Sequence, residues 1–175
     1  MNNLYNTDYH QWLSQQVTLL KTQNFNQLDL ENLIEDLELS IKQDLRVLDS
    51  HLVILILHLL KIDYQTSVLR DSIATERVLK GWVVSICNAR RDIDKLIEKN
   101  HCLTAKIEEV LSEAYPDAKE RAVKEMNIYA SSETQRLNDS SFPPECPWSF
   151  EQIMTEDWYP LNGVNLYDRR LAAGG

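Results

Sequence analysis

The stretch LENLIEDLELSIKQDLRVLDSHLVILILHLLKI, residues 30–62, decides the fold of this chain. Its apolar residues recur at steps of three and four, which is the spacing of one face of an α-helix. They are Leu30, Leu33, Ile34, Leu37, Ile41, Leu45, Leu48, Leu52, Leu55, Leu59 and Ile62. We predict a long helix whose apolar stripe is buried against other helices. Polar residues nearly disappear between residues 52 and 60, so protein should surround that part on most sides.

The rest of the pattern predicts an all-α fold, a four-helix-type bundle with this long second helix at its centre. The four expected helices cover residues 8–23, 29–63, 76–99 and 104–130. Asp8, Asp29 and Thr104 stand where side-chain caps of helix N-termini are expected. Two points stay open in the pattern: the second helix is either continuous or broken near Ser40, and Pro116 either kinks the fourth helix or begins a new one.

The C-terminal region has a different character. Residues 142–160, FPPECPWSFEQIMTEDWYP, combine prolines with aromatic residues and predict an extended strap that packs back onto the bundle. Within it, Ser149 and Gln152 have the spacing of a capping box, so a short helix should run to about Glu156. We expect a single helical domain over residues 1–160 and a tail over residues 161–175.

Composition narrows the class of protein. The chain has 175 residues and a net charge of -9, which repels phosphate backbones and argues against nucleic-acid binding. Its three cysteines are odd in number and not closely paired, as in a reduced cytosolic protein. The longest apolar run is far short of the ~20 residues that span a bilayer, and no signal peptide is visible. We therefore expect an acidic, soluble, cytoplasmic protein.

Four polar residues form the most suggestive candidate site: Glu35, His58, Lys61 and Arg90. Arg90 lies in the apolar phase of its helix, so its charge must be paired, and Glu35 or Asp36 is the expected partner. One interpretation is a buried ion-pair network that fixes the register of the helices. The other is an anion site, in which Arg90 and Lys61 hold a carboxylate or phosphate and His58 moves a proton.

Other motifs carry less weight, and we predict neither a metal nor a cofactor. His51 and His58 are two turns apart, roughly 10 Å along a helix, too far to bind one metal. A di-iron bundle needs two Glu-x-x-His motifs, and only Glu98 with His101 fits that spacing. Arg46 and His51 have the Arg-x4-His spacing of small helical ribonucleases, but one such match is expected by chance.

A set of landmarks resembles the bacterial family known as domain of unknown function 29, which is abundant in cyanobacteria. The matching pieces are Tyr5, Asp8 and Trp12, the block from Asp29 to Asp36, the block from His58 to Lys61, Trp82, Ile86, Arg90, Ile93, Ala114, Tyr115, Phe142, Pro143, Cys146, Pro147, Trp148 and Pro160. The resemblance implies an all-helical fold and no established activity. Asp36, Gly81 and the longer connection 127–141 depart from the family pattern.

Two functional hypotheses follow. The leading one is a non-enzymatic helical protein that binds another protein or a second copy of itself, with Phe142, Trp148 and Trp158 as partner-binding anchors. The alternative is a hydrolase or nucleic-acid-processing enzyme whose catalytic residues are Glu35, His58, Lys61 and Arg90. That alternative requires the four side chains to converge on an open cleft.

Overall fold

The computed structural model describes residues 4–69, 72–128, 130 and 136–164, and within these residues the protein is all-α without a strand. The helices are α1 (Leu4–Thr7), α2 (Tyr9–Lys21), α3 (Leu30–Tyr64), α4 (Ser72–Lys99), α5 (Ile107–Asn127) and α6 (Phe150–Met154). Short 3-10 turns cover Phe25–Gln27, His101–Lys106 and Asp139–Ser141. The predicted fold class is confirmed, and α3 is continuous through Ser40.

The chain divides into two compact units, residues 1–43 and 44–175, and helix α3 begins in the first and ends in the second. Each unit is described by itself below. The prediction of a single domain over residues 1–160 stays a prediction.

In the first unit, α2 is attached to the start of α3 by polar contacts of side chains that range from buried to exposed. The indole N–H of Trp12 donates to the Asp29 carboxylate at 3.1 Å, and the side-chain oxygen of Gln16 accepts from the Asp29 amide at 2.9 Å. The Tyr9 hydroxyl donates to Asp36 at 2.9 Å. The ring of Tyr5 packs edge-on against Trp12, with 4.7 Å between centroids. These contacts hold one face of α3 against α2.

Two of the predicted caps belong to this unit, and both are present. The Asp8 carboxylate accepts from the amide of Gln11 at 3.0 Å, at the start of α2. Asp29 accepts from the amide of Asn32 at 3.5 Å and from its side-chain amide at 2.7 Å. The bonds satisfy amides that have no partner within their own helix.

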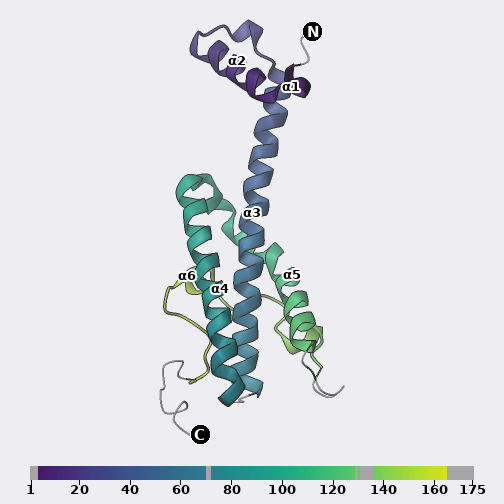
Figure 1. Ribbon diagram of the computed structural model, residues 1–175, viewed down its shortest axis with the longest axis vertical. Helices are drawn as coiled ribbons and strands as arrows, with labels where there is room; N and C mark the ends of the chain where they lie inside the picture. The colour runs from purple at the N-terminus through teal and green to yellow at the C-terminus, as the bar shows by residue number, and fades with distance from the viewer. Residues whose placement is uncertain (1–3, 70–71, 129, 131–135, 165–175) are drawn as a thin grey trace. The chain divides into compact units, whose positions relative to one another are not determined.

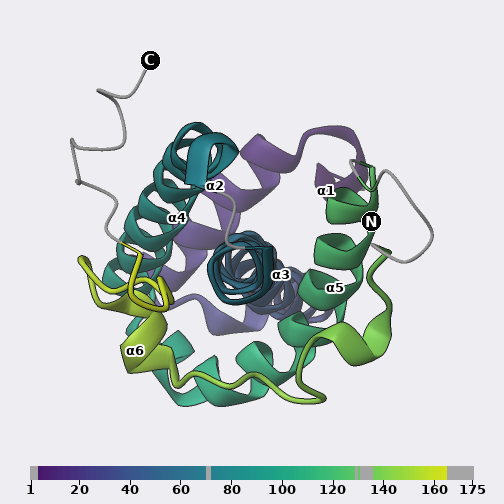
Figure 2. The same ribbon diagram turned by 90° about the horizontal axis from the view of Figure 1, so that it is seen from below.

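In the second unit, the C-terminal part of α3 forms the core, with α4, α5 and α6 around it (Figures 1 and 2). Its fully buried residues are Leu48, Leu52, Val53, Leu55, Ile56, Leu59, Leu60 and Ile62. From α4 come Leu79, Ile86 and Ile93, and from α5 come Ala114, Ala118 and Ala122. The expectation that protein surrounds residues 52–60 on most sides is confirmed.

The apolar stripe of α3 is not buried along its whole length, and that part of the prediction is wrong. Leu30, Ile34, Leu37 and Ile41 are each between 56% and 63% exposed. Asp29 and Asp36, on the face that α2 covers, each precede one of these residues by one position, which is a 100° rotation about the helix. The neighbouring apolar face is therefore left open.

Two local predictions are also corrected, and an open alternative is decided. The third helix was expected to begin at residue 76, but α4 begins at Ser72; a π-helical turn, Gln65–Leu69, follows α3, and residues 70–71 lie outside the described part. Thr104 lies within a 3-10 turn and caps nothing, because α5 begins at Ile107. Of the two alternatives for Pro116, a new helix that begins there is excluded, because Pro116 lies inside α5. Proline has no N–H to donate to the carbonyl four residues before it. Because Pro116 lies on an exposed face of α5, water can bind that carbonyl instead.

The strap is present and packs on the second unit. Phe142 is buried beside Tyr64, with 5.8 Å between ring centroids, and Ile153 of α6 is fully buried. Ser149 caps α6, which ends at Met154, earlier than expected. Packing continues past Pro160, because the Asn162 side chain donates to Asp63 at 2.9 Å. Residues 165–175 of the predicted tail lie outside the described part.

Candidate functional site

Arg90 of α4 is buried, only 5% exposed, and it holds the end of the strap. Its Nε donates to the carbonyl of Ile153 at 2.7 Å, Nη1 to that of Glu156 at 2.8 Å and Nη2 to that of Trp158 at 2.7 Å. The guanidinium also lies over the ring of Tyr159, 5.0 Å from its centroid. One planar side chain thus binds three main-chain oxygens, a geometry that suits the fixed fork of arginine.

The predicted pairing of Arg90 with Glu35 or Asp36 is therefore wrong. The phase of Arg90 was predicted correctly, because it is buried in register with Ile86 and Ile93. Its hydrogen bonds, however, go to carbonyl oxygens, whose partial charges take the place of a carboxylate. Burial lowers the pKa of Arg90, but an arginine stays protonated at any ordinary pH.

Lys61 of α3 is the second buried charge, with its side chain 8% exposed. Its Nζ lies 2.6 Å from a carboxylate oxygen of Glu125 on α5 and 4.6 Å from the ring centroid of Trp82 on α4. Sequence reasoning did not find Glu125 as the partner. The signal was present, since Glu125 follows the buried Ala118 and Ala122 at helical steps of four and three.

His58 lies one turn before Lys61 and is half-buried. Burial, and then the charge of Lys61, lower the pKa of His58 to about 4, while Glu125 opposes the shift. Its buried Nδ1 has no hydrogen-bond partner among the described residues. His58 is therefore a neutral imidazole at physiological pH.

The four predicted catalytic residues thus have different surroundings. Arg90 is bound to the strap, whereas Lys61 and His58 lie by Glu125. Glu35 is exposed in the first unit. Within the described ranges, no three His, Cys, Asp or Glu side chains gather in a way that would hold a metal ion.

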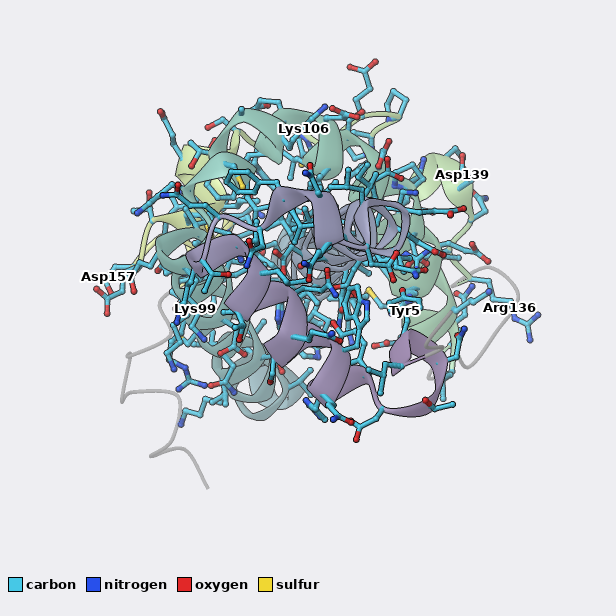
Figure 3. All side chains as sticks on the ribbon, turned by 90° about the horizontal axis from the view of Figure 1, so that it is seen from above. Tyr5, Lys99, Lys106, Arg136, Asp139 and Asp157 are labelled. Atoms are coloured by element: carbon cyan, nitrogen blue, oxygen red, sulfur yellow. The ribbon has the colours of Figure 1, made fainter. Side chains whose placement is uncertain are left out.

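A surface hollow of the second unit carries charges of both signs. It is lined by Leu45, Arg46, Asp49, Lys106, Glu109, Val110 and Glu113. Lys106, which lies at the edge of the unit in Figure 3, pairs with Glu109 at 2.7 Å. Partial burial raises the pKa of Asp49, with contributions from the nearby Asp117 and Glu113. The residues predicted to be catalytic, Glu35, His58, Lys61 and Arg90, are not among the residues that line this hollow.

Another buried lysine has a partner of similar kind. Lys119 of α5, with its side chain 8% exposed, lies 3.0 Å from a carboxylate oxygen of Asp139, which projects at the rim of the second unit (Figure 3). Like Lys61, Lys119 keeps its charge inside the unit while its carboxylate partner reaches solvent.

The predicted partner-binding residues differ in exposure. Phe142 is buried in the core, so its ring is not available on the surface. Trp148 and Trp158 are half-buried and pack edge to face, with 5.6 Å between ring centroids. Partner binding by these two tryptophans stays a prediction.

The structure thus defines an all-helical protein whose buried charges bind main-chain carbonyls or carboxylates of its own chain. Residues 4–159 match the sequence model of the family described as "Domain of unknown function DUF29". The chain belongs to this family. Comparison with curated proteins gave no match, and comparison with solved structures gave none either. In the part of the chain that the structure describes, every helix is too short or too polar to cross a membrane.

Proposed function

We propose that this protein acts by binding another protein through its first unit and does not catalyse a reaction. One observation carries the proposal: Leu30, Ile34, Leu37 and Ile41 form an exposed apolar stripe on α3. We call these four residues the open stripe. Single exposed apolar residues are ordinary on protein surfaces, whereas contiguous ones mark interaction sites.

The spacing of the open stripe supports recognition by a partner. Its steps of four, three and four place the four side chains in one row along α3. Rows of this kind serve as anchors when a helix binds an apolar surface. Covering a large aliphatic side chain contributes about 1.5–3 kcal/mol when it is fully exposed beforehand, so four side chains somewhat more than half exposed offer roughly 4–7 kcal/mol before the costs of association.

The enzyme alternative has less support. It requires Arg90 and Lys61 to be available to a substrate, but Arg90 already binds three carbonyls of the strap and Lys61 already binds Glu125. A substrate anion would have to displace these contacts. The same bonds have a simple structural purpose, because buried charges need partners.

Site-specific cross-linking tests the proposal. A photoreactive amino acid at position 37 should yield a discrete cross-linked protein in cells that make this chain, and the same amino acid at the exposed polar position Gln15 should not. The captured protein, once purified, should bind the purified chain, and Leu37→Asp should weaken that binding. The proposal would be overturned if position 37 cross-linked no protein beyond those that position 15 also captures. It would also be overturned if the captured protein, once purified, did not bind the purified chain.

A further inference from the structure

We infer that the open stripe takes a basic amphipathic helix of a separate protein. The inference rests on the proposed function and adds the chemistry of the partner. Its evidence is the charge that borders the stripe.

An acidic ribbon runs beside the open stripe along α3. Glu31, Glu35 and Glu38 each follow a residue of the stripe by one position, which is a rotation of 100° around the helix. All three side chains are exposed. The opposite border of the stripe is the face that α2 covers, so the ribbon is the charged border that a partner meets.

The ribbon carries a net negative charge after its local contacts are considered. Lys42 lies 4.0 Å from Glu38, an exposed pair that contributes little. Asp36 is engaged by the Tyr9 hydroxyl and belongs to the face toward α2. Glu31 and Glu35 therefore remain as the main electrostatic feature next to Leu30 and Ile34.

Charge also decides between the possible occupants. Residues 1–43 contain six acidic and two basic side chains, a net charge of −4. The whole chain has a net charge of -9, so residues 44–175 contribute −5. A second copy of the chain, or the rest of the same chain, carries a net negative charge like that of the ribbon. Like charges brought together in an interface are unfavourable, whereas a basic partner is complementary.

The length of the stripe sets the size of the ligand. Leu30 to Ile41 spans eleven residue steps, which is about 16 Å of helix at 1.5 Å per residue. A partner helix of roughly three to four turns matches that length. It would carry apolar residues at steps of three and four, with lysine or arginine beside them to meet the ribbon.

Synthetic helical peptides test the inference with the full chain. The probe is a fluorescent peptide of leucines at helical spacing with lysines on the remaining face. Its first control has the same composition in an order that destroys the apolar face, and its second has glutamate in place of every lysine. We expect anisotropy to show binding of the first peptide only, weakening as salt rises.

Variants of the chain locate the binding. Leu37→Asp should weaken the binding of the basic peptide on the order of tenfold, while the circular dichroism spectrum of the chain stays unchanged. The double substitution E31K and E35K should weaken binding of the basic peptide by a similar factor. The same variant should bind the glutamate peptide more tightly than the unchanged chain does. The matched control is E108K with E151K, which makes the same charge change at exposed positions of the second unit and should leave binding unchanged.

Each outcome has a definite reading. Equal weakening by the control pair would show unspecific attraction to an acidic chain and would overturn the inference. Failure of the basic peptide to bind, while cross-linking from position 37 still captures a partner, would overturn the inference alone. If Leu37→Asp instead dissociates a dimer in sedimentation, the occupant is a second copy and the inference is wrong.

Discussion

Replacing Arg90 with alanine should destabilise the second unit far more than replacing its neighbour Arg91. Arg90 is buried and donates to the carbonyls of Ile153, Glu156 and Trp158. Alanine would remove all three hydrogen bonds and leave a cavity between α4 and the strap. The strap would lose its bonds at positions 153, 156 and 158 and keep those at Pro160 and Asn162.

The magnitude follows from the contacts. A hydrogen bond to a charged group contributes about 1.5–3 kcal/mol, so three bonds bring roughly 5–9 kcal/mol before opposing terms. Burial of the guanidinium reduces that sum, and the carbonyls of Glu156 and Trp158 regain water when the strap moves. We expect a net loss of about 3–5 kcal/mol, which in a chain of this size lowers the melting temperature by roughly 6–20 °C.

Urea unfolding followed by circular dichroism measures the loss, and tryptophan fluorescence reports the release of Trp148 and Trp158. Arg91→Ala is the matched control: the Arg91 side chain is 60% exposed and lies 3.6 Å from Asp92, so its loss should cost at most about 1 kcal/mol. Arg90→Lys keeps the charge without the planar fork and should fall between the two. Equal small losses for Arg90→Ala and Arg91→Ala would refute the reasoning.

Three further predictions concern the second unit. The pKa of His58 is about 4 in the folded chain and about 6.5 in the unfolded chain. As pH falls, the unfolded chain therefore binds the proton first, and the free energy of unfolding decreases by about 2 kcal/mol by pH 5. In urea unfolding at pH 7.5 and pH 5, His58→Gln should lack this loss, whereas the exposed control His101→Gln should keep it. Ile153 is fully buried, so Ile153→Ala should cost about 2–5 kcal/mol in thermal unfolding. Ile128 is 73% exposed, so the control Ile128→Ala should change stability by no more than about 0.5 kcal/mol. Equal costs would contradict the packing of α6. Tyr115→Phe loses a 2.7 Å hydrogen bond to the strap, which should cost about 1–2 kcal/mol in the same assay. An ultraviolet pH titration should also lose a phenol that ionises near pH 12, because burial raises the pKa of Tyr115 to about 12.

The helices and three of the four predicted caps were predictable because their causes are local in the sequence, whereas the cap predicted at Thr104 is absent. Asp8 and Ser149 each bond an amide three residues ahead, as their positions indicated. Periodicity, in contrast, gives the phase of an apolar face but not what covers it. Ile34 and Leu55 lie on the same predicted stripe, yet one is exposed and the other is buried, because the packing of other elements decides their burial.

The candidate site was less predictable, for a reason specific to each charge. For Arg90 the phase indicated burial, but the acceptors are main-chain oxygens, which leave no mark in a sequence. For Lys61 the partner Glu125 is 64 positions away, and only its helical phase pointed inward. Glu35 or Asp36 was expected as the partner of Arg90 because Glu35 lies beside Ile34 of the predicted apolar stripe.

The attachment of the strap by Arg90 also shapes how this family can change over evolution. An ion pair couples two side chains, so a change at one position calls for a change at the other. A carbonyl oxygen belongs to every amino acid, and the residues at positions 153, 156 and 158 can be exchanged without losing the acceptor. The arginine is then constrained alone, and aligned relatives should show no covariation between Arg90 and these three positions.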